Sequence, residues 1–140
     1  MKNKPYLSLH LRTFAAEDPG SWQPIIDQAI AADRAGIGKV VVSDHVVFGE
    51  ALEAYADPTI GGLAGGKQPT GPDGLWLEPL TVLSVLAGLT SSIRLGTNIL
   101  LAALRRPAVL AKSVATLDVV SGGRVDLGVG VGWQKEEYEA

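Results

Sequence analysis

The chain alternates four times between segments that favour β-strands and segments that favour α-helices. Short apolar runs rich in β-branched residues, such as 39–43, are typical of strands buried on both faces. Each run is followed by a longer segment with apolar residues at helical spacing. The expected strands span 6–11, 39–43, 93–101 and 124–131, and the expected helices span 21–36, 78–91, 106–123 and 133–140. This order predicts an α/β fold in which helices connect the strands of a parallel sheet.

Residues at the expected helix ends support this assignment. Ser21 is a candidate N-cap for the first helix, and Gly36 follows its last turn. Pro79 and Pro107 fall in the first turns of the next two helices, where proline is tolerated. Gly122 follows the third helix as a candidate C-cap.

The composition limits the classes of protein to consider. With 140 residues, of which 46% are hydrophobic, the chain is long and apolar enough for one domain with a core. The net charge of −3 comes without a basic stripe, so nucleic acid is not an expected partner. Cysteine is absent, which excludes disulfides, thiolate ligands and a cysteine nucleophile. We find neither a signal peptide nor an apolar stretch of about 18 residues, and we expect a cytoplasmic protein with no membrane partner.

One connection is much longer than the others. Residues 46–78, between the second strand and the second helix, are rich in glycine, proline and aspartate. A loop of this length inside a compact domain is usually functional or disordered. We therefore treat 1–140 as one domain in which 46–78 is an insertion.

Two glycine-rich stretches only partly match nucleotide-binding motifs. GGLAGGKQ at 61–68 has Gln68 where a phosphate-binding loop needs serine or threonine for Mg²⁺. GVGVG at 128–132 lacks the spacing of the dinucleotide fingerprint. Glycines near a strand end do let a backbone or a flat ligand approach closely. We therefore expect neither a phosphate loop nor a dinucleotide site.

Polar residues and glycines gather where the expected strands end. All four strands contribute to this pattern. The residues are His10 on the first strand, Asp44 and His45 after the second, Asn98, Arg105 and Arg106 in and after the third, and Gly130, Gly132 and Trp133 at the fourth. The carboxyl ends of parallel strands share one edge of the sheet, and α/β enzymes build active sites there. The sequence therefore predicts a functional site at this edge.

Several of these residues also have a purely structural interpretation. Asp44 suits a turn residue that binds a loop backbone, His45 a structural histidine, and Asn98 a buried amide. Arg105 and Arg106 suit a solvated helix entry. A metal site would need His10, Asp44 and His45 to converge from distant segments, so we expect no metal. No G-x-S-x-G turn is present, which argues against a serine hydrolase.

Three stretches resemble the luciferase-like monooxygenase superfamily, and within it the branch of F420-dependent oxidoreductases. They are VVVSDHVVF at 40–48, IRLGTNILLAALRRPAVLAKSVATLDVVSGGR at 93–124 and DLGVGVGWQKEEYEA at 126–140. The resemblance implies the N-terminal half of a (β/α)₈ TIM barrel, with four parallel βα units. It also implies an oxidoreductase or monooxygenase that binds coenzyme F420, or alternatively FMN, and acts on a small molecule of unknown identity.

The resemblance implies roles for particular residues. His45 would lie near the reactive face of the cofactor ring and would orient or exchange a proton. Asp44 would orient the imidazole or bond the polar edge of the ring, and both residues would be catalytic. A non-prolyl cis peptide at Asn98–Ile99 would lie behind the ring. The other implied cofactor-binding residues are Gly130 and Gly132, which would let the ring approach the fourth strand, and His10.

Two features depart from the family's pattern. Arg106 stands where the family usually has a histidine, so the contacts of that histidine are not expected here. A complete barrel takes about 250 residues, and this chain supplies about half. Three interpretations stay open: a piece of a longer enzyme, a chain that closes a barrel as a homo-oligomer or with another chain, and an open sheet without activity. The alternative function is therefore a cofactor-binding or interaction module.

Overall fold

The computed structural model describes residues 6–47 and 69–140. The glycine-rich stretch at 61–68 and most of the expected insertion lie outside these residues. The strands are β1 (Ser8–His10), β2 (Phe14–Ala15), β3 (Lys39–Val42), β4 (Leu75–Trp76), β5 (Arg94–Thr97), β6 (Leu100–Leu101), β7 (Val125–Asp126) and β8 (Val129–Gly130). The helices are α1 (Gln23–Arg34), α2 (Pro79–Leu89), the short 3₁₀ helix η2 (Ala102–Leu104), α3 (Pro107–Ser121) and α4 (Glu136–Glu139). None of the helices in the described ranges is long and apolar enough to cross a lipid bilayer.

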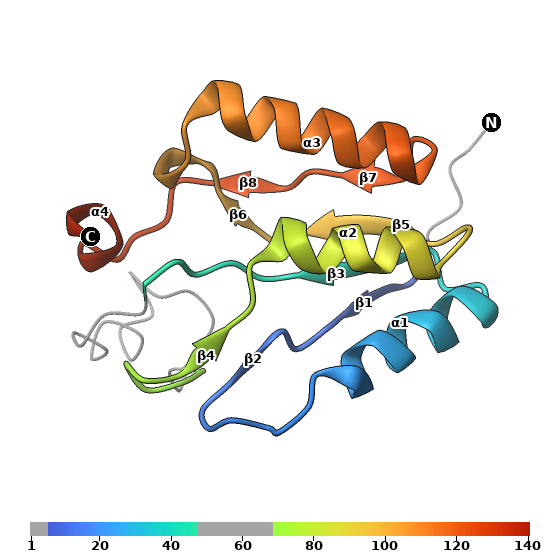
Figure 1. Ribbon diagram of the computed structural model, residues 1–140, viewed down its shortest axis with the longest axis horizontal. Coiled ribbons are helices and arrows are strands. Elements are labelled where there is room, and N and C mark those ends of the chain that lie inside the picture. Colours follow the sequence, from blue (N-terminus) through green and yellow to red (C-terminus); the bar gives the residue numbers. More distant parts are fainter. Residues whose placement is uncertain (1–5, 48–68) are drawn as a thin grey trace.

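A four-stranded sheet in the order β1-β3-β5-β7 forms the centre of the fold (Figure 1). All three strand pairs are parallel, and each strand neighbours the next one of the repeat. Helices α1, α2 and α3 follow β1, β3 and β5 in turn and carry the chain back to the start of the next strand. These pairings confirm the predicted α/β fold with a parallel sheet.

The third and fourth expected strands are each divided in two, which corrects the prediction of continuous strands over 93–101 and 124–131. β5 ends at Thr97 and β6 begins at Leu100, and the intervening peptide bond between Asn98 and Ile99 is cis, as predicted. At the same level β7 gives way to β8, which pairs with β6 in parallel. The Thr97 side chain bridges the gap, because its Oγ1 donates to the carbonyl of Gly128 at 2.7 Å and accepts from the Gly128 amide at 3.0 Å.

A second, antiparallel ladder lies beside the main sheet and was not predicted. β2 pairs with β4, so that Phe14 lies opposite Trp76 and Ala15 opposite Leu75. Two residues per strand are too few for a hydrophobic period, and β4 lies within the segment that we assigned to the long insertion. The final part of that segment is therefore ordered against β2, which follows β1.

Most helix ends lie at the residues that predicted them. Pro79 and Pro107 begin α2 and α3, and Gly122 ends α3 in the left-handed conformation at φ 75°. The Glu78 side chain caps α2 by accepting from the amide of Thr81 at 2.7 Å. At α1 the N-cap is Trp22, not Ser21, although the Ser21 hydroxyl still accepts from the amide of Gln23 at 3.1 Å.

The hydrophobic core lies between the sheet and the three long helices. In the strand register Leu9, Val40, Leu95 and Val125 form one row, and all of them belong to or pack against the core. The helices contribute Ala29 and Ala32 from α1, Leu83 and Leu86 from α2, and Leu117 from α3. Side chains alternate between the faces of a sheet, so the neighbouring rows belong to the opposite face.

That opposite face carries a cluster of charges near the start of the strands. Asp126 lies 3.4 Å from Nζ of Lys39 and accepts a hydrogen bond of 2.9 Å from Nε of Arg94. The hydrogen bond from Arg94 holds the pKa of Asp126 below its ordinary value, despite partial burial. The three side chains are 24% to 39% exposed. The face of the sheet opposite the helices is therefore polar near the strand starts, whereas the face covered by the helices is apolar.

Asp33 at the end of α1 fixes the turn that leads into β5. Its carboxylate accepts hydrogen bonds from the amides of Ser91, Ser92 and Ile93 at 2.7 to 3.0 Å, and from both serine hydroxyls. Burial alone would raise the pKa of Asp33, but these hydrogen bonds outweigh burial and hold the pKa far below its ordinary value of 3.8. One carboxylate therefore ties the first helix to the third strand of the sheet.

We expect Asp33→Asn to lower the free energy of unfolding at pH 7 by about 1–3 kcal/mol, because amides that now bind a charged acceptor lose it. The folded-state pKa is depressed, so the contribution of Asp33 is present above pH 3.8 and is lost as the pH falls below that value. Urea unfolding at pH 7 and at decreasing pH measures this difference. Asp27→Asn is the matched control on the same helix, since Asp27 accepts from the exposed Gln23 side chain, and we expect a change within about 0.5 kcal/mol. Equal effects of both substitutions would contradict the assignment.

Candidate active site

A cleft of about 280 Å³ opens at the C-terminal ends of the strands. It is lined by residues from β1, β3 and the β5–β6 junction, and by the segment after β8. Six of the predicted site residues line it: His10, Asp44, His45, Asn98, Ile99 and Gly132. The structure therefore brings together residues that are separated by up to 122 positions in the sequence, at the sheet edge that the strand pattern indicated.

His45 is held by a buried glutamate from the C-terminal segment. Its Nδ1 lies 3.0 Å from Oε1 of Glu137, and the same oxygen accepts a hydrogen bond of 3.0 Å from the amide of Val46. The Glu137 side chain is 1% exposed and the His45 side chain 15%. A carboxylate only accepts hydrogen bonds, so Nδ1–H of His45 donates to Glu137, and proton exchange is assigned to Nε2. Oε2 of Glu137 is buried without a hydrogen-bond partner among the described residues.

Asp44 binds elsewhere than expected. Its Oδ2 accepts from the amide of Leu101 at 2.8 Å and from Nη1 of Arg105, and its Oδ1 accepts from Nη2 of Arg105 at 3.1 Å. The Asp44 side chain is 1% exposed. We expected Asp44 to orient the imidazole of His45 or to bond the polar edge of the cofactor ring, and in this structure Glu137 has the first of these positions. Asp44 instead joins the end of β3 to β6, which matches its structural interpretation as a carboxylate that binds a loop backbone.

Arg105 also links this ion pair to the start of α2. Its Nη2 donates to Oε1 of Glu78 at 3.3 Å. Burial lowers the pKa of Arg105, but the hydrogen bonds to Asp44 and Glu78 outweigh it and raise the pKa. Burial raises the pKa of Glu78, but hydrogen bonds from Thr81 and Arg105 leave it below its ordinary value. Arg105 is thus a structural cation, not the solvated helix entry that was its alternative interpretation.

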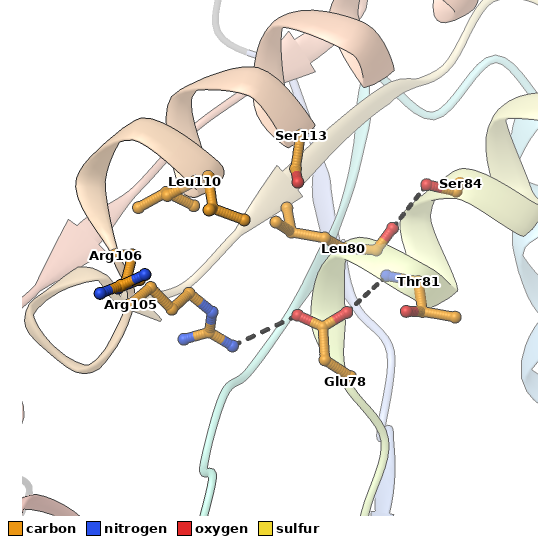
Figure 2. A pocket seen from close by; sticks show the side chains of 9 residues that line it. Glu78, Leu80, Thr81, Ser84, Arg105, Arg106, Leu110 and Ser113 are labelled. Atoms are coloured by element: carbon orange, nitrogen blue, oxygen red, sulfur yellow. Dashed lines mark hydrogen bonds and ion pairs between the residues drawn. The ribbon is translucent and has the colours of Figure 1, made fainter.

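Figure 2 shows the pocket of about 450 Å³ beside this arginine, between the starts of α2 and α3. Arg105 and Glu78 point toward each other across it, and Arg106 and Ser113 lie on the α3 side. Glu78 already caps α2 and pairs with Arg105, so the pocket's central charges neutralise each other. We therefore assign the chemistry to the smaller cleft around His45.

His10 and Asn98 are connected through Ser43 at the floor of the cleft. Nε2 of His10 lies 2.8 Å from the hydroxyl of Ser43, and this hydroxyl donates to the carbonyl of Asn98 at 3.5 Å. The tautomer of His10 sets which of these two groups donates the shorter hydrogen bond. Desolvation lowers the pKa of His10. The ends of β1, β3 and β5 are thus joined by a short polar chain.

The two predicted glycines of the fourth strand differ in their surroundings. Gly132 lines the cleft and has φ 78°, a conformation that favours glycine. A Cβ at Gly130 would overlap the Cδ1 atom of Ile99, so the close approach that this glycine permits is made by a side chain of the neighbouring strand. Gly130 therefore contributes to the wall of the cleft through Ile99.

Aromatic residues of the β2–β4 ladder form the side of the cleft next to His45. The rings of Phe14 and Trp76 stack at 4.3 Å and 22°. The indole of Trp76 meets the imidazole of His45 edge to face, at 4.6 Å and 72°. Trp133 lines the same cleft.

Sequence reasoning missed Glu137, Ser43, Phe14 and Trp76 as members of the site. Glu137 lies in the charged run EEYE, which reads as an ordinary exposed helix turn, yet its side chain is buried. The available signal was position, because α4 follows the end of β8 directly, at the same edge as the other site residues. Nothing in the sequence around Phe14 and Trp76 indicated a place in the site, because the β2–β4 ladder that positions them was not predicted.

The parallel sheet and the cleft at its strand ends define an α/β protein with a site suited to a small molecule. The family model for luciferase-like monooxygenases matches residues 6–140. The chain therefore belongs to the luciferase-like monooxygenase family, which confirms the resemblance seen in its motifs. This is a family of enzymes, and monooxygenases and F420-dependent oxidoreductases occur among the similar proteins.

Curated relatives align over part of the chain. An uncharacterised protein of Mycobacterium tuberculosis is 48% identical over 61 residues, which is 44% of this chain and 22% of that protein. Pyrimidine monooxygenase RutA of Escherichia coli is 41% identical over 63 residues, which is 45% of this chain and 19% of RutA. The aligned part thus spans about a fifth of the length of these relatives.

Solved structures align over nearly the whole chain. Monooxygenase RslO1 from Streptomyces bottropensis is 25% identical with a TM-score of 0.62, covering 94% of this chain and 35% of RslO1. The 3,6-diketocamphane monooxygenase of Pseudomonas putida, in complex with FMN, is 22% identical with a TM-score of 0.63, covering 96% and 31%. The F420-dependent tetrahydromethanopterin reductase from Methanopyrus kandleri is 23% identical with a TM-score of 0.58, covering 96% and 29%. The last two show the fold alone, and this chain spans about a third of each structure.

The ion pair of Asp44 makes a prediction about stability. Asp44→Asn leaves Arg105 without its buried counter-charge, and we expect a loss of about 3–5 kcal/mol in the free energy of unfolding. Asp126→Asn is the matched control, because it removes the carboxylate that pairs with the more exposed Arg94. We expect it to lower the free energy of unfolding by about 1 kcal/mol or less. Urea unfolding measures both. The assignment is wrong if Asp44→Asn costs no more than the control.

Proposed function

We propose that this chain supplies ring-binding and acid–base residues to the active site of an oxidoreductase that uses coenzyme F420, with FMN as the alternative. The observation that carries the proposal is the His45–Glu137 pair, which lies in the cleft at the strand ends. An imidazole held in place by a buried carboxylate is suited to exchange protons with a bound ring or substrate. The small-molecule substrate is not identified by these residues.

The residues of the cleft fit the ring portion of such a cofactor. Ile99, Leu101 and Trp133 provide apolar surface, and Oε2 of Glu137 is a buried acceptor that lacks a donor among the described residues. The described lining contains neither lysine nor arginine, so it suits a flat ring better than a phosphate tail. We propose that Asn98, Ile99, Gly132 and His10 contact the ring, and that Gly130 acts through Ile99.

A bound flavin or deazaflavin would supply the two-electron redox chemistry. His45 would hold or release a proton at Nε2, because Nδ1–H is engaged by Glu137. Glu137 would hold the imidazole in one orientation through this hydrogen bond. We assign Asp44 the task of fixing the chain at the end of β3, directly before His45.

We also propose that the four-stranded sheet is the first half of a (β/α)₈ barrel. The four parallel strands in sequential order support this proposal, as does the alignment of nearly the whole chain with about a third of RslO1. The polar face around Asp126 would then line the barrel interior. We further propose that the chain forms a homo-oligomer. In it, β1 and the β7–β8 segment would contact another copy of the chain.

The alternative is a cofactor-binding or interaction module without catalysis. The family match and the convergence of titratable residues in one cleft favour the oxidoreductase. The two functions differ in one respect that can be measured, since only the oxidoreductase needs the proton-exchanging nitrogen of His45.

We expect saturable binding when the chain is titrated with coenzyme F420 and, separately, with FMN, followed by ring absorbance and fluorescence. One of the two cofactors should bind more tightly. With that cofactor, His45→Gln should leave the Kd within about twofold and lower turnover by about 10²- to 10⁴-fold, the usual contribution of a general acid or base. Turnover is measured as substrate-dependent reduction of the cofactor, or as oxygen-dependent oxidation of the reduced cofactor, over a panel of small alcohols and carbonyl compounds.

Thr116→Val is the control variant, because Thr116 lies on α3 and its hydroxyl donates to the carbonyl of Lys112. It should match the wild type in Kd and turnover. Full activity of His45→Gln would show that His45 is not the acid–base residue. If neither cofactor binds, the proposed function is wrong for this chain.

A further inference from the structure

Trp76 connects three parts of the candidate site. Its indole Nε1 donates to the hydroxyl of Thr70 at 3.0 Å, its ring stacks on Phe14, and it meets the imidazole of His45 edge to face. Trp76 and Phe14 are also opposite each other in the β2–β4 ladder. The position of the indole is therefore set by backbone pairing, by stacking and by a directed hydrogen bond.

The acceptor of that hydrogen bond is itself fixed. Thr70 is 3% exposed, and the chain after it turns back so that the amide of Gly74 donates to the carbonyl of Gly71 at 3.0 Å. A Cβ at Gly74 would overlap the Thr70 side chain, so the close packing of this turn requires glycine. Pro72 and Asp73 occupy the centre of the turn, where both residue types are common.

The contact with Trp76 adds a restraint that Glu137 cannot provide. The hydrogen bond from Nδ1 to Glu137 fixes one atom of the His45 ring, but the ring plane can still tilt about that bond. An aromatic ring packed edge to face at 4.6 Å restricts this tilt. Both contacts therefore restrict where Nε2 points.

We propose that Trp76 is a positioning residue for His45, and that Thr70 acts through Trp76. The inference rests on the proposed function, because it assigns to the β2–β4 ladder the task of aiming the proton-exchanging nitrogen of that site. The ladder begins directly after β1 and ends directly before α2, so both of its strands are continuous with elements of the main fold. The ladder therefore restricts the movement of the imidazole through its contact with Trp76.

The sequence contains only two histidines, His10 and His45, so their imidazole Cε1–H signals can be followed by proton NMR in the full chain. Thr70→Val keeps the shape of the side chain but removes the acceptor for the indole. We expect it to shift the His45 signal and to leave the His10 signal in place. Thr70→Ser, which restores a hydroxyl, should return the signal to its wild-type position, and Trp76→Leu should shift it further because the ring current is lost. Thr116→Val controls for loss of a threonine hydroxyl elsewhere.

Turnover with the bound cofactor gives the second measurement. Misplacement of a reacting group by about 1 Å can cost about 100-fold in rate, so we expect Thr70→Val to lower kcat by about 10- to 100-fold with an unchanged cofactor Kd. A His45 signal that stays in place in Thr70→Val would overturn the inference, even if His45→Gln is inactive. Thr70→Val could also shift the His45 signal and still keep the wild-type kcat. If His45→Gln is inactive, that result would overturn the inference too. A fully active His45→Gln would instead overturn the proposed function.

Discussion

The buried ion pair between Asp44 and Arg105 is the interaction on which the site depends. It joins the last residues of β3 to β6 and, through Glu78, to the start of α2. The carboxylate is almost completely buried, so it needs both the guanidinium and the Leu101 amide to offset the loss of water. Because Asp44 is fixed in this way, the next residue, His45, enters the cleft in a defined direction.

Two separate segments then determine how the imidazole is held. Glu137, which follows β8, accepts a hydrogen bond from its Nδ1–H, and Trp76, which precedes α2, packs against its ring. The groups that carry the proposed chemistry thus come from the second and fourth strand ends and from the β2–β4 ladder. The parallel sheet brings them together because every strand delivers its C-terminal end to the same edge.

The sequence was a good guide where the signal was local. Asp44 and His45 come directly after the apolar run of β3, at the strand end where α/β enzymes build active sites, so the sequence predicts both as site residues. Their partners were not identified, because Glu137 resembles its charged neighbours and Arg105 resembles a solvated helix entry. Which of two nearby carboxylates reaches His45 depends on how β8, which precedes Glu137, pairs with β6, and this pairing does not follow from periodicity. The β2–β4 ladder was missed for the same reason.

We propose that the cleft beside His45 and Glu137 holds the ring of a flavin-type cofactor. The most direct test is a crystal structure of this chain with coenzyme F420 or FMN bound, whichever binds in solution. Our account predicts that the ring lies between the Asn98–Ile99 segment and His45, with Nε2 of His45 directed toward the ring or a substrate beside it. A ring bound in the pocket between α2 and α3, or anywhere away from His45, would contradict it.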